Sequence, residues 1–222
     1  ILLRKGCKYR KIDIFQFLII DKANHHLHKI CFMRKLLLFF ALVVLISTHT
    51  YAQTTYVVTP TGGTVGNTNG TGADPICRFY NSIRYQVVYT VAELSASGMT
   101  AGTTLTRIAW NVTESSSSLG NYIIKMGHTS ATNSLTHNTA ATTTVKNAHT
   151  YSVSTGWNDI TFDNTFTWNG TDNIVVEICT GPSNPFTSPY GGVQAKTGLT
   201  NGSRHIRADG SSQCGNNTVT PN

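Results

Sequence analysis

Short extended runs with alternating side chains, and not helical repeats, form the main pattern of the chain after residue 53. In one such run Tyr122, Ile124 and Met126 share a face, which is typical of a strand buried on one side. The run at 174–178 is almost continuously apolar, which is typical of a central strand buried on both faces. The pattern therefore indicates sheets and not helices.

Segments rich in Gly, Asn, Ser and Pro separate these runs about every ten residues, as turns do in antiparallel sandwiches. The sequence thus predicts an all-β protein, an antiparallel β-sandwich of jelly-roll-like architecture with about nine strands. One helical turn is predicted at a corner of the sandwich, at 92–95. The predicted strands are 54–59, 84–91, 105–113, 121–129, 148–153, 158–168, 173–179, 192–197 and 203–208.

A segment with the features of a secretory signal peptide occupies residues 33–52. A basic start at 33–35 precedes an apolar run at 36–46, and cleavage is predicted between Ala52 and Gln53. The apolar run of about 11 residues is shorter than the roughly 20 that span a bilayer, so no stable membrane span is predicted. A retained anchor is the alternative. The expected location is secreted or at the cell surface.

The residues before and after this leader are assigned to three further segments. Residues 1–32 are interpreted as non-native translation upstream of a start at Met33. Residues 53–71 are predicted to form a flexible segment leading into the sandwich, with a Gly-rich first hairpin as the alternative. Residues 72–222 form the predicted β-sandwich module.

Charge is distributed unevenly between the leader and the rest of the chain. Residues 1–52 carry the whole net charge of +7, and residues 53–222 carry equal numbers of basic and acidic side chains. Binding to a phosphate backbone needs clustered Lys and Arg, which are scattered in the mature part. No nucleic-acid partner is therefore predicted.

Three cysteines, Cys77, Cys179 and Cys214, lie in the predicted mature part. Exported proteins form disulfides in oxidising compartments. Cys179 ends a predicted strand and Cys214 lies in the polar loop after another, so a Cys179–Cys214 disulfide is favoured. A Cys77–Cys179 disulfide is the alternative. No Cys-x-x-Cys or His-x-x-x-His spacing accompanies the thiols, so no metal site is predicted.

Several segments resemble a β-sandwich module that is repeated in secreted and surface proteins of Bacteroidetes-type bacteria. Residues 85–94, YQVVYTVAEL, are similar to its QxIYxAxEL segment, and residues 102–110 to its next strand. Residues 156–179, which begin with GWNDITF and end with NIVVEIC, resemble its GWNxIxFxxPFxWxGxxNLVVEIC run. The resemblance covers about residues 72–217.

The resemblance implies a sandwich that occurs beside fibronectin type III, MAM-like, peptidase or type IX sorting domains. It also implies truncation, because the strand that usually closes the module does not appear before Asn222. We expect a non-catalytic secreted or cell-surface binding or adhesion module of a larger protein. An accessory substrate-targeting domain of a secreted peptidase or polysaccharide-degrading enzyme, and a structural spacer in a repeat array, are the alternatives. Expected partners are a glycan or extracellular protein and neighbouring domains.

No catalytic residues are predicted, and the chain is not expected to be an enzyme. It has no Gly-x-Ser-x-Gly elbow, and no sequence feature marks two of its carboxylates as the catalytic pair of a glycosidase. Glu177 lies in a predicted buried strand and is interpreted as the partner of a cation or of backbone groups. Asp163, Asp172 and Asp209 could supply oxygens to calcium, although hydrogen bonds within turns are the simpler interpretation. No other cofactor is predicted.

Aromatic residues provide the predicted contact surface. Phe186 and Tyr190 lie in a loop with three prolines that follows a predicted strand, and such loops often carry binding residues. Aromatic side chains that only cap the sandwich are the alternative. Trp110, Trp157 and Trp168 could form a sugar-stacking platform, but core packing is favoured because the first two lie in or beside alternating strands.

Overall fold

The computed structural model describes residues 32–36, 54–72 and 74–215. The chain divides into two compact units, Ile1–Thr54 and Thr55–Asn222. In the first unit residues 32–36 are helical. The second unit contains every strand described below.

The predicted leader falls largely outside these ranges. Its cleavage site between Ala52 and Gln53 and most of its apolar run are not among the described residues. In the part of the chain that the structure does describe, no helix is long and apolar enough to cross a membrane.

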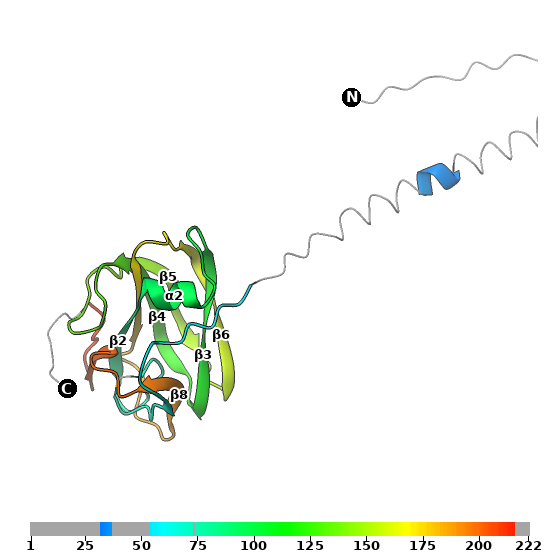
Figure 1. Ribbon diagram of the computed structural model, residues 1–222. Coiled ribbons are helices and arrows are strands. Elements are labelled where there is room, and N and C mark those ends of the chain that lie inside the picture. Colours follow the sequence, from blue (N-terminus) through cyan, green and yellow to red (C-terminus); the bar gives the residue numbers. More distant parts are fainter. Residues whose placement is uncertain (1–31, 37–53, 73, 216–222) are drawn as a thin grey trace, which may run out of the picture. The chain divides into compact units, whose positions relative to one another are not determined.

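The second unit is an antiparallel β-sandwich, as predicted (Figure 1). A short helix, α2 (Val91–Ala96), connects its second and third strands. The nine strands of the described residues are β1 (Thr64–Asn67), β2 (Ser82–Tyr89), β3 (Thr104–Ser116), β4 (Leu119–Thr129), β5 (Thr143–Tyr151), β6 (Gly156–Thr167), β7 (Asn173–Thr180), β8 (Tyr190–Thr197) and β9 (Ser203–Ala208).

Strand pairing follows a jelly roll. One sheet has the order β1-β8-β3-β6 and the other has the order β5-β4-β7-β2-β9. The first eight strands pair from the outside inward, β1 with β8, β2 with β7, β3 with β6 and β4 with β5. A long eight-stranded ribbon that is folded over in this way gives the two Greek keys of a jelly roll. β9 extends the five-stranded sheet beyond β2.

The core lies between the sheets and follows the predicted alternation. Tyr122, Ile124 and Met126 of β4 are all buried. All eight residues of β7 are buried, and this strand lies at the centre of the five-stranded sheet. The continuously apolar run is therefore a central strand covered on both faces, as its composition predicts.

The largest error in the predicted elements is at the start of the sandwich. Residues 54–59 form no strand; Tyr56 and Val58 pack against the core while Val57 is exposed. The first strand is instead β1, within the Gly-rich segment, and it pairs with β8. β1 has four residues and a mostly exposed pattern, so neither apolar alternation nor length indicated it.

The predicted helical turn is confirmed as α2. The Thr90 side chain accepts a hydrogen bond from the Glu93 backbone N–H, and the Glu93 carboxylate accepts one from the Thr90 N–H at 2.8 Å. This reciprocal capping box satisfies two backbone donors that a helix start leaves unpaired. Leu94 is buried and anchors the turn to the core.

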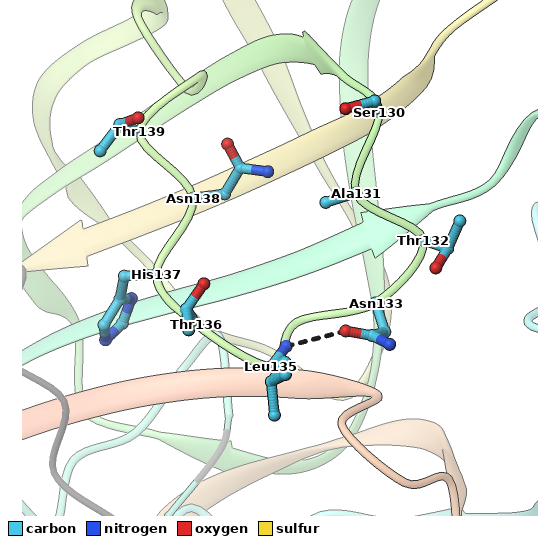
Figure 2. Close-up of a pocket in the computed structure, with 9 residues that line it drawn as sticks. All are labelled: Ser130, Ala131, Thr132, Asn133, Leu135, Thr136, His137, Asn138 and Thr139. Carbon is cyan, nitrogen blue, oxygen red and sulfur yellow. Dashed lines mark hydrogen bonds between the residues drawn. The ribbon is translucent and has the colours of Figure 1, made fainter.

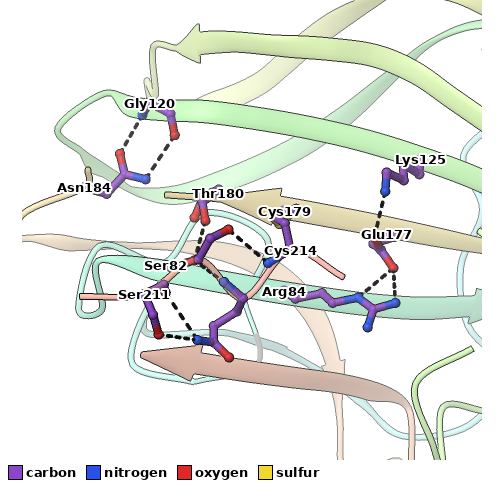
Figure 3. Close-up of a disulfide and its surroundings, with 12 residues drawn as sticks. Ser82, Arg84, Gly120, Lys125, Glu177, Cys179, Thr180, Asn184, Ser211 and Cys214 are labelled. Carbon is purple, nitrogen blue, oxygen red and sulfur yellow. Dashed lines mark hydrogen bonds and ion pairs between the residues drawn. A yellow bond between two sulfur atoms is a disulfide. The ribbon is translucent and has the colours of Figure 1, made fainter. Parts of the chain in front are cut away.

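The favoured disulfide is also confirmed. Cys179 at the end of β7 is bonded to Cys214, with a Cα–Cα distance of 5.5 Å (Figure 3). Beside it, the Ser82 hydroxyl donates to the Thr180 carbonyl at 2.7 Å and accepts from the Gln213 N–H at 2.9 Å. A covalent bond and a hydrogen bond thus hold the segment after β9 against the outer face of the five-stranded sheet.

Cys77, the remaining cysteine of the described residues, is a buried free thiol. Its Sγ donates to the Gly70 carbonyl at 2.7 Å. Burial raises the pKa of this thiol, which keeps it protonated and unreactive. The alternative pairing with Cys179 is therefore wrong.

Candidate functional site

Four aromatic side chains from two distant segments form one cluster, which we call the aromatic cluster. Phe79 and Tyr80 precede β2, Phe186 lies in the loop after β7, and Tyr190 is the first residue of β8. The Phe79 ring lies at the centre, with centroid distances of 5.0 Å to Tyr80, 5.3 Å to Phe186 and 5.0 Å to Tyr190. Phe186 and Tyr190 also meet at 5.2 Å. Two of these contacts are edge-to-face, the arrangement that aromatic quadrupoles favour.

The aromatic cluster reaches the surface mainly through Phe186, whose side chain is 56% exposed. The other three rings are partly buried. At the edge of the cluster the Arg207 guanidinium lies 4.6 Å from the centroid of the Tyr80 ring, within cation–π range. The result is an apolar surface with a cationic margin.

Buried polar residues hold the loop that carries Phe186. Asn184 is 1% exposed; its Oδ1 accepts from the Gly120 N–H at 2.6 Å and its Nδ2 donates to the Gly120 carbonyl at 3.1 Å (Figure 3). Arg78 donates to Asn184 Oδ1 at 3.0 Å and to the Thr187 hydroxyl at 3.3 Å. Burial lowers the pKa of Arg78. These bonds fix the loop to β4 and to the segment before β2.

Backbone geometry supports the same arrangement. The Arg78 N–H donates to the Tyr190 carbonyl at 2.9 Å, which places Phe79 beside the start of β8. Gly181 begins the loop at φ +92°, and a Cβ there would lie 2.3 Å from the Asn81 carbonyl oxygen. Only glycine fits both the left-handed backbone and this close approach.

A buried carboxylate shapes the segment that leads to Phe79. Asp74 is 1% exposed and accepts hydrogen bonds from the Thr68 hydroxyl, from the Ile76 N–H at 2.8 Å and from the Gly70 N–H at 3.3 Å. Burial raises the pKa of Asp74 to about 6. The three donors fix this turn, and Thr68 joins it to Val193 of β8.

Sequence reasoning named half of the aromatic cluster. Phe186 and Tyr190 lie side by side, as a shared contact surface requires. Phe79 and Tyr80 were missed, because they lie more than 100 positions earlier in the chain and only the jelly-roll pairing brings them there. The available signal was a pair of adjacent aromatic residues a few positions before the predicted strand 84–91.

The tryptophans do not form a common platform. Trp110 and Trp168 are buried in the core and donate their indole N–H to Tyr122 Oη at 3.1 Å and to the Asp172 carbonyl at 2.7 Å. Trp157, however, is 62% exposed, so its predicted core packing is wrong. Its β6 neighbours, Asn158 and Ile160, face inward, and the period of two places Trp157 outward.

Glu177 has the structural partner that the sequence indicated. Its carboxylate accepts from Arg84 Nη2 at 2.7 Å and Nε at 2.8 Å and from Gln86 Nε2 at 2.6 Å, and Lys125 Nζ lies 3.9 Å away (Figure 3). Arg84 and Glu177 are both almost completely buried. The interpretation of Glu177 as the partner of a cation is confirmed.

The three aspartates considered for calcium each have different partners. Asp163 accepts from Lys146 Nζ at 2.8 Å, Asp172 from Asn169 Nδ2 at 2.7 Å, and Asp209 from a backbone N–H at 3.1 Å. Among the residues that the structure describes, no group of three or more His, Cys, Asp or Glu side chains is arranged to hold a metal ion.

The loop after β4 encloses a shallow hollow on the sandwich (Figure 2). His137, which lines it, is 8% exposed, and neither of its ring nitrogens has a hydrogen-bond partner. Burial, with positive charge from Arg84 and Arg204, lowers the pKa of His137 to about 4. The residues that line the hollow are Ser130, Ala131, Thr132, Asn133, Leu135, Thr136, His137, Asn138 and Thr139.

This hollow has the chemistry of a solvated loop. One continuous segment supplies its lining, mainly small hydroxyl and amide side chains, and the Asn133 side chain accepts from the Leu135 N–H of the same loop at 3.0 Å. His137 remains neutral at physiological pH because its pKa is depressed. The aromatic cluster, which joins two distant loops, is the better candidate site.

Comparison of the chain with protein-family models, with curated proteins and with solved structures finds no match. The case for function therefore depends on the geometry described above.

Proposed function

We propose that the chain is an exported, non-catalytic binding module, and that the aromatic cluster is its contact surface for an extracellular protein. The observation that carries the proposal is the 56% exposure of Phe186 on a loop held by buried hydrogen bonds. A large apolar side chain held rigidly in water loses little entropy when a partner covers it.

The composition of the surface favours a protein partner. Aromatic residues and arginine are enriched in the energetically important centres of protein interfaces. Here Phe186 and Tyr190 adjoin Tyr80, which itself lies under Arg207. Phe79 contacts Phe186 and Tyr190 edge to face, so the cluster offers an uneven apolar surface and not one flat ring on which a sugar would stack.

Further observations support an exported protein that acts by display. A disulfide joins Cys179 to Cys214, and such bonds persist in oxidising compartments. The leader at 33–52 and the resemblance to surface modules point in the same direction. Since Arg84 and Gln86 occupy the carboxylate of the buried Glu177, this acid serves the fold and not a reaction.

The test is binding of the purified protein to immobilised extracellular matrix proteins, with collagen, fibronectin and laminin as probes, by biolayer interferometry. We expect Phe186→Ala to weaken binding at least tenfold, equivalent to about 1.4 kcal/mol. Leu135→Ala is the matched control, because Leu135 is 58% exposed on a different loop. Equal loss from both variants, or no binding to any probe, would contradict the proposal.

A further inference from the structure

A row of polar side chains ending in a tryptophan crosses the outer face of the four-stranded sheet. We call it the amide row: Asn67, Gln194, Asn111 and Trp157, one from each of β1, β8, β3 and β6. Asn67 is opposite Gln194, and Asn111 is opposite Trp157. Asn111 Nδ2 donates to Gln194 Oε1 at 3.1 Å, which joins the two halves.

The amide row faces away from the core. Val112 and Val193, the sequence neighbours of Asn111 and Gln194, are buried, so the period of two turns the amides outward. Asn67 and Gln194 are exposed, and Trp157 is 62% exposed. With strands 4.7–4.9 Å apart, three steps across the sheet make the row about 14 Å long.

The chemistry of the amide row is that of an uncharged, hydroxyl-rich ligand. An amide side chain donates and accepts hydrogen bonds, as a sugar hydroxyl does. Trp157 is exposed, and the C–H face of a pyranose ring can stack on an exposed indole. The row itself holds no ionised side chain; on the same face Arg107 and Asp159 pair with each other at 3.3 Å, and Lys196 lies two positions after Gln194 on β8. Because no ionised group lies in the row, a neutral ligand fits it better than a charged one.

From this arrangement we infer that the amide row binds a neutral polysaccharide chain, with one sugar ring stacked on Trp157 and the following hydroxyls hydrogen-bonded to Asn111 and Gln194. β6 is the edge strand of the four-stranded sheet, so Trp157 lies at one end of the row. Ala109, which is opposite Asp159 on the neighbouring strand, has a small side chain and so leaves space beside the indole of Trp157. This site is separate from the aromatic cluster and does not depend on it.

The experiment is a titration of the purified protein with cellohexaose, xylohexaose and mannohexaose as neutral probes. The chain has three tryptophans, and Trp110 and Trp168 are buried. A shift in tryptophan emission on binding therefore reports on Trp157. We expect one of the three probes to give a saturable shift, and isothermal titration calorimetry to give the same dissociation constant.

Variants decide whether the amide row is responsible. We expect Trp157→Ala to abolish binding in calorimetry, and Asn111→Ala with Gln194→Ala to weaken it at least tenfold, while circular dichroism stays unchanged because these side chains are exposed or half-buried. Phe186→Ala is expected to bind as the parent does. The inference is overturned if no probe binds, if Trp157→Ala binds normally, or if only the anionic probe heparin binds. If Phe186→Ala loses protein binding but binds the sugar probe as the parent does, the inference about the amide row stands.

Discussion

Removal of the Cys179–Cys214 disulfide should cost the sandwich about 4 kcal/mol of unfolding free energy. The bond closes a loop with a sequence separation of 35. In the chain-entropy model a loop of that length lowers the entropy of the unfolded chain by about 13 cal/mol/K, which gives about 4 kcal/mol at 25 °C. That loss is a large fraction of the 5–15 kcal/mol typical of a domain.

The measurement is urea unfolding of the double variant Cys179→Ala with Cys214→Ala, followed by circular dichroism. Both the midpoint and the slope are informative: an unfolded chain without the crosslink exposes more surface, so the m-value should rise while the extrapolated free energy falls. Cys77→Ala is the control for a lost buried sulfur without a lost crosslink. A double variant within about 1 kcal/mol of the parent, with an unchanged m-value, would refute the reasoning.

Two further predictions concern buried charge. Glu177→Gln should destabilise the fold by roughly 3–5 kcal/mol in urea unfolding, because Arg84 keeps its charge in a buried site. The double variant Glu177→Leu with Arg84→Met should recover most of this loss. An unchanged free energy of unfolding in Glu177→Gln would contradict this account. Acidification should also destabilise the fold. Burial lowers the pKa values of His137 and His205 from 6.5 to about 4, so the unfolded chain takes up two protons there first, and stability is lost as the pH falls through this window. Asp74, with its pKa raised to about 6, has the opposite sign, which leaves a net uptake of about one proton on unfolding and a loss of about 2–3 kcal/mol between pH 6.5 and 4. Thermal unfolding across this pH range measures the loss of stability, and a midpoint temperature that does not change with pH would contradict the prediction.

The strands that sequence patterns predicted best are those whose surroundings are uniform along their length. β7 is buried throughout and mostly apolar because both of its faces are covered, and β4 alternates because only one of its faces is covered. The disulfide was also predictable, since Cys179 lies at the end of one strand and Cys214 lies in the loop after another. In these elements local composition and tertiary position agree, so the one indicates the other.

What was missed depends on contacts between distant segments. β1 is held by pairing with β8, and its own composition favours a loop. The contact of Phe79 with Phe186 and the ion pair of Arg84 with Glu177 each join residues that only the strand order brings together. Trp157 was misassigned because the alternation in its strand shows that successive side chains point to opposite faces, but it does not show which face is turned to the core.

The position of the crosslink also determines how the module would carry mechanical load. Tension on the chain beyond Cys214 passes through the disulfide to Cys179 and so directly into β7, the central strand of the five-stranded sheet. The 34 residues between the two cysteines cannot lengthen under such a pull while the bond is intact. β8, β9 and the loop that carries Phe186 all lie within that closed segment. A tether on this side therefore puts no tension on the Phe186 loop, on β8 or on β9, which keep their shape while the chain beyond Cys214 is pulled.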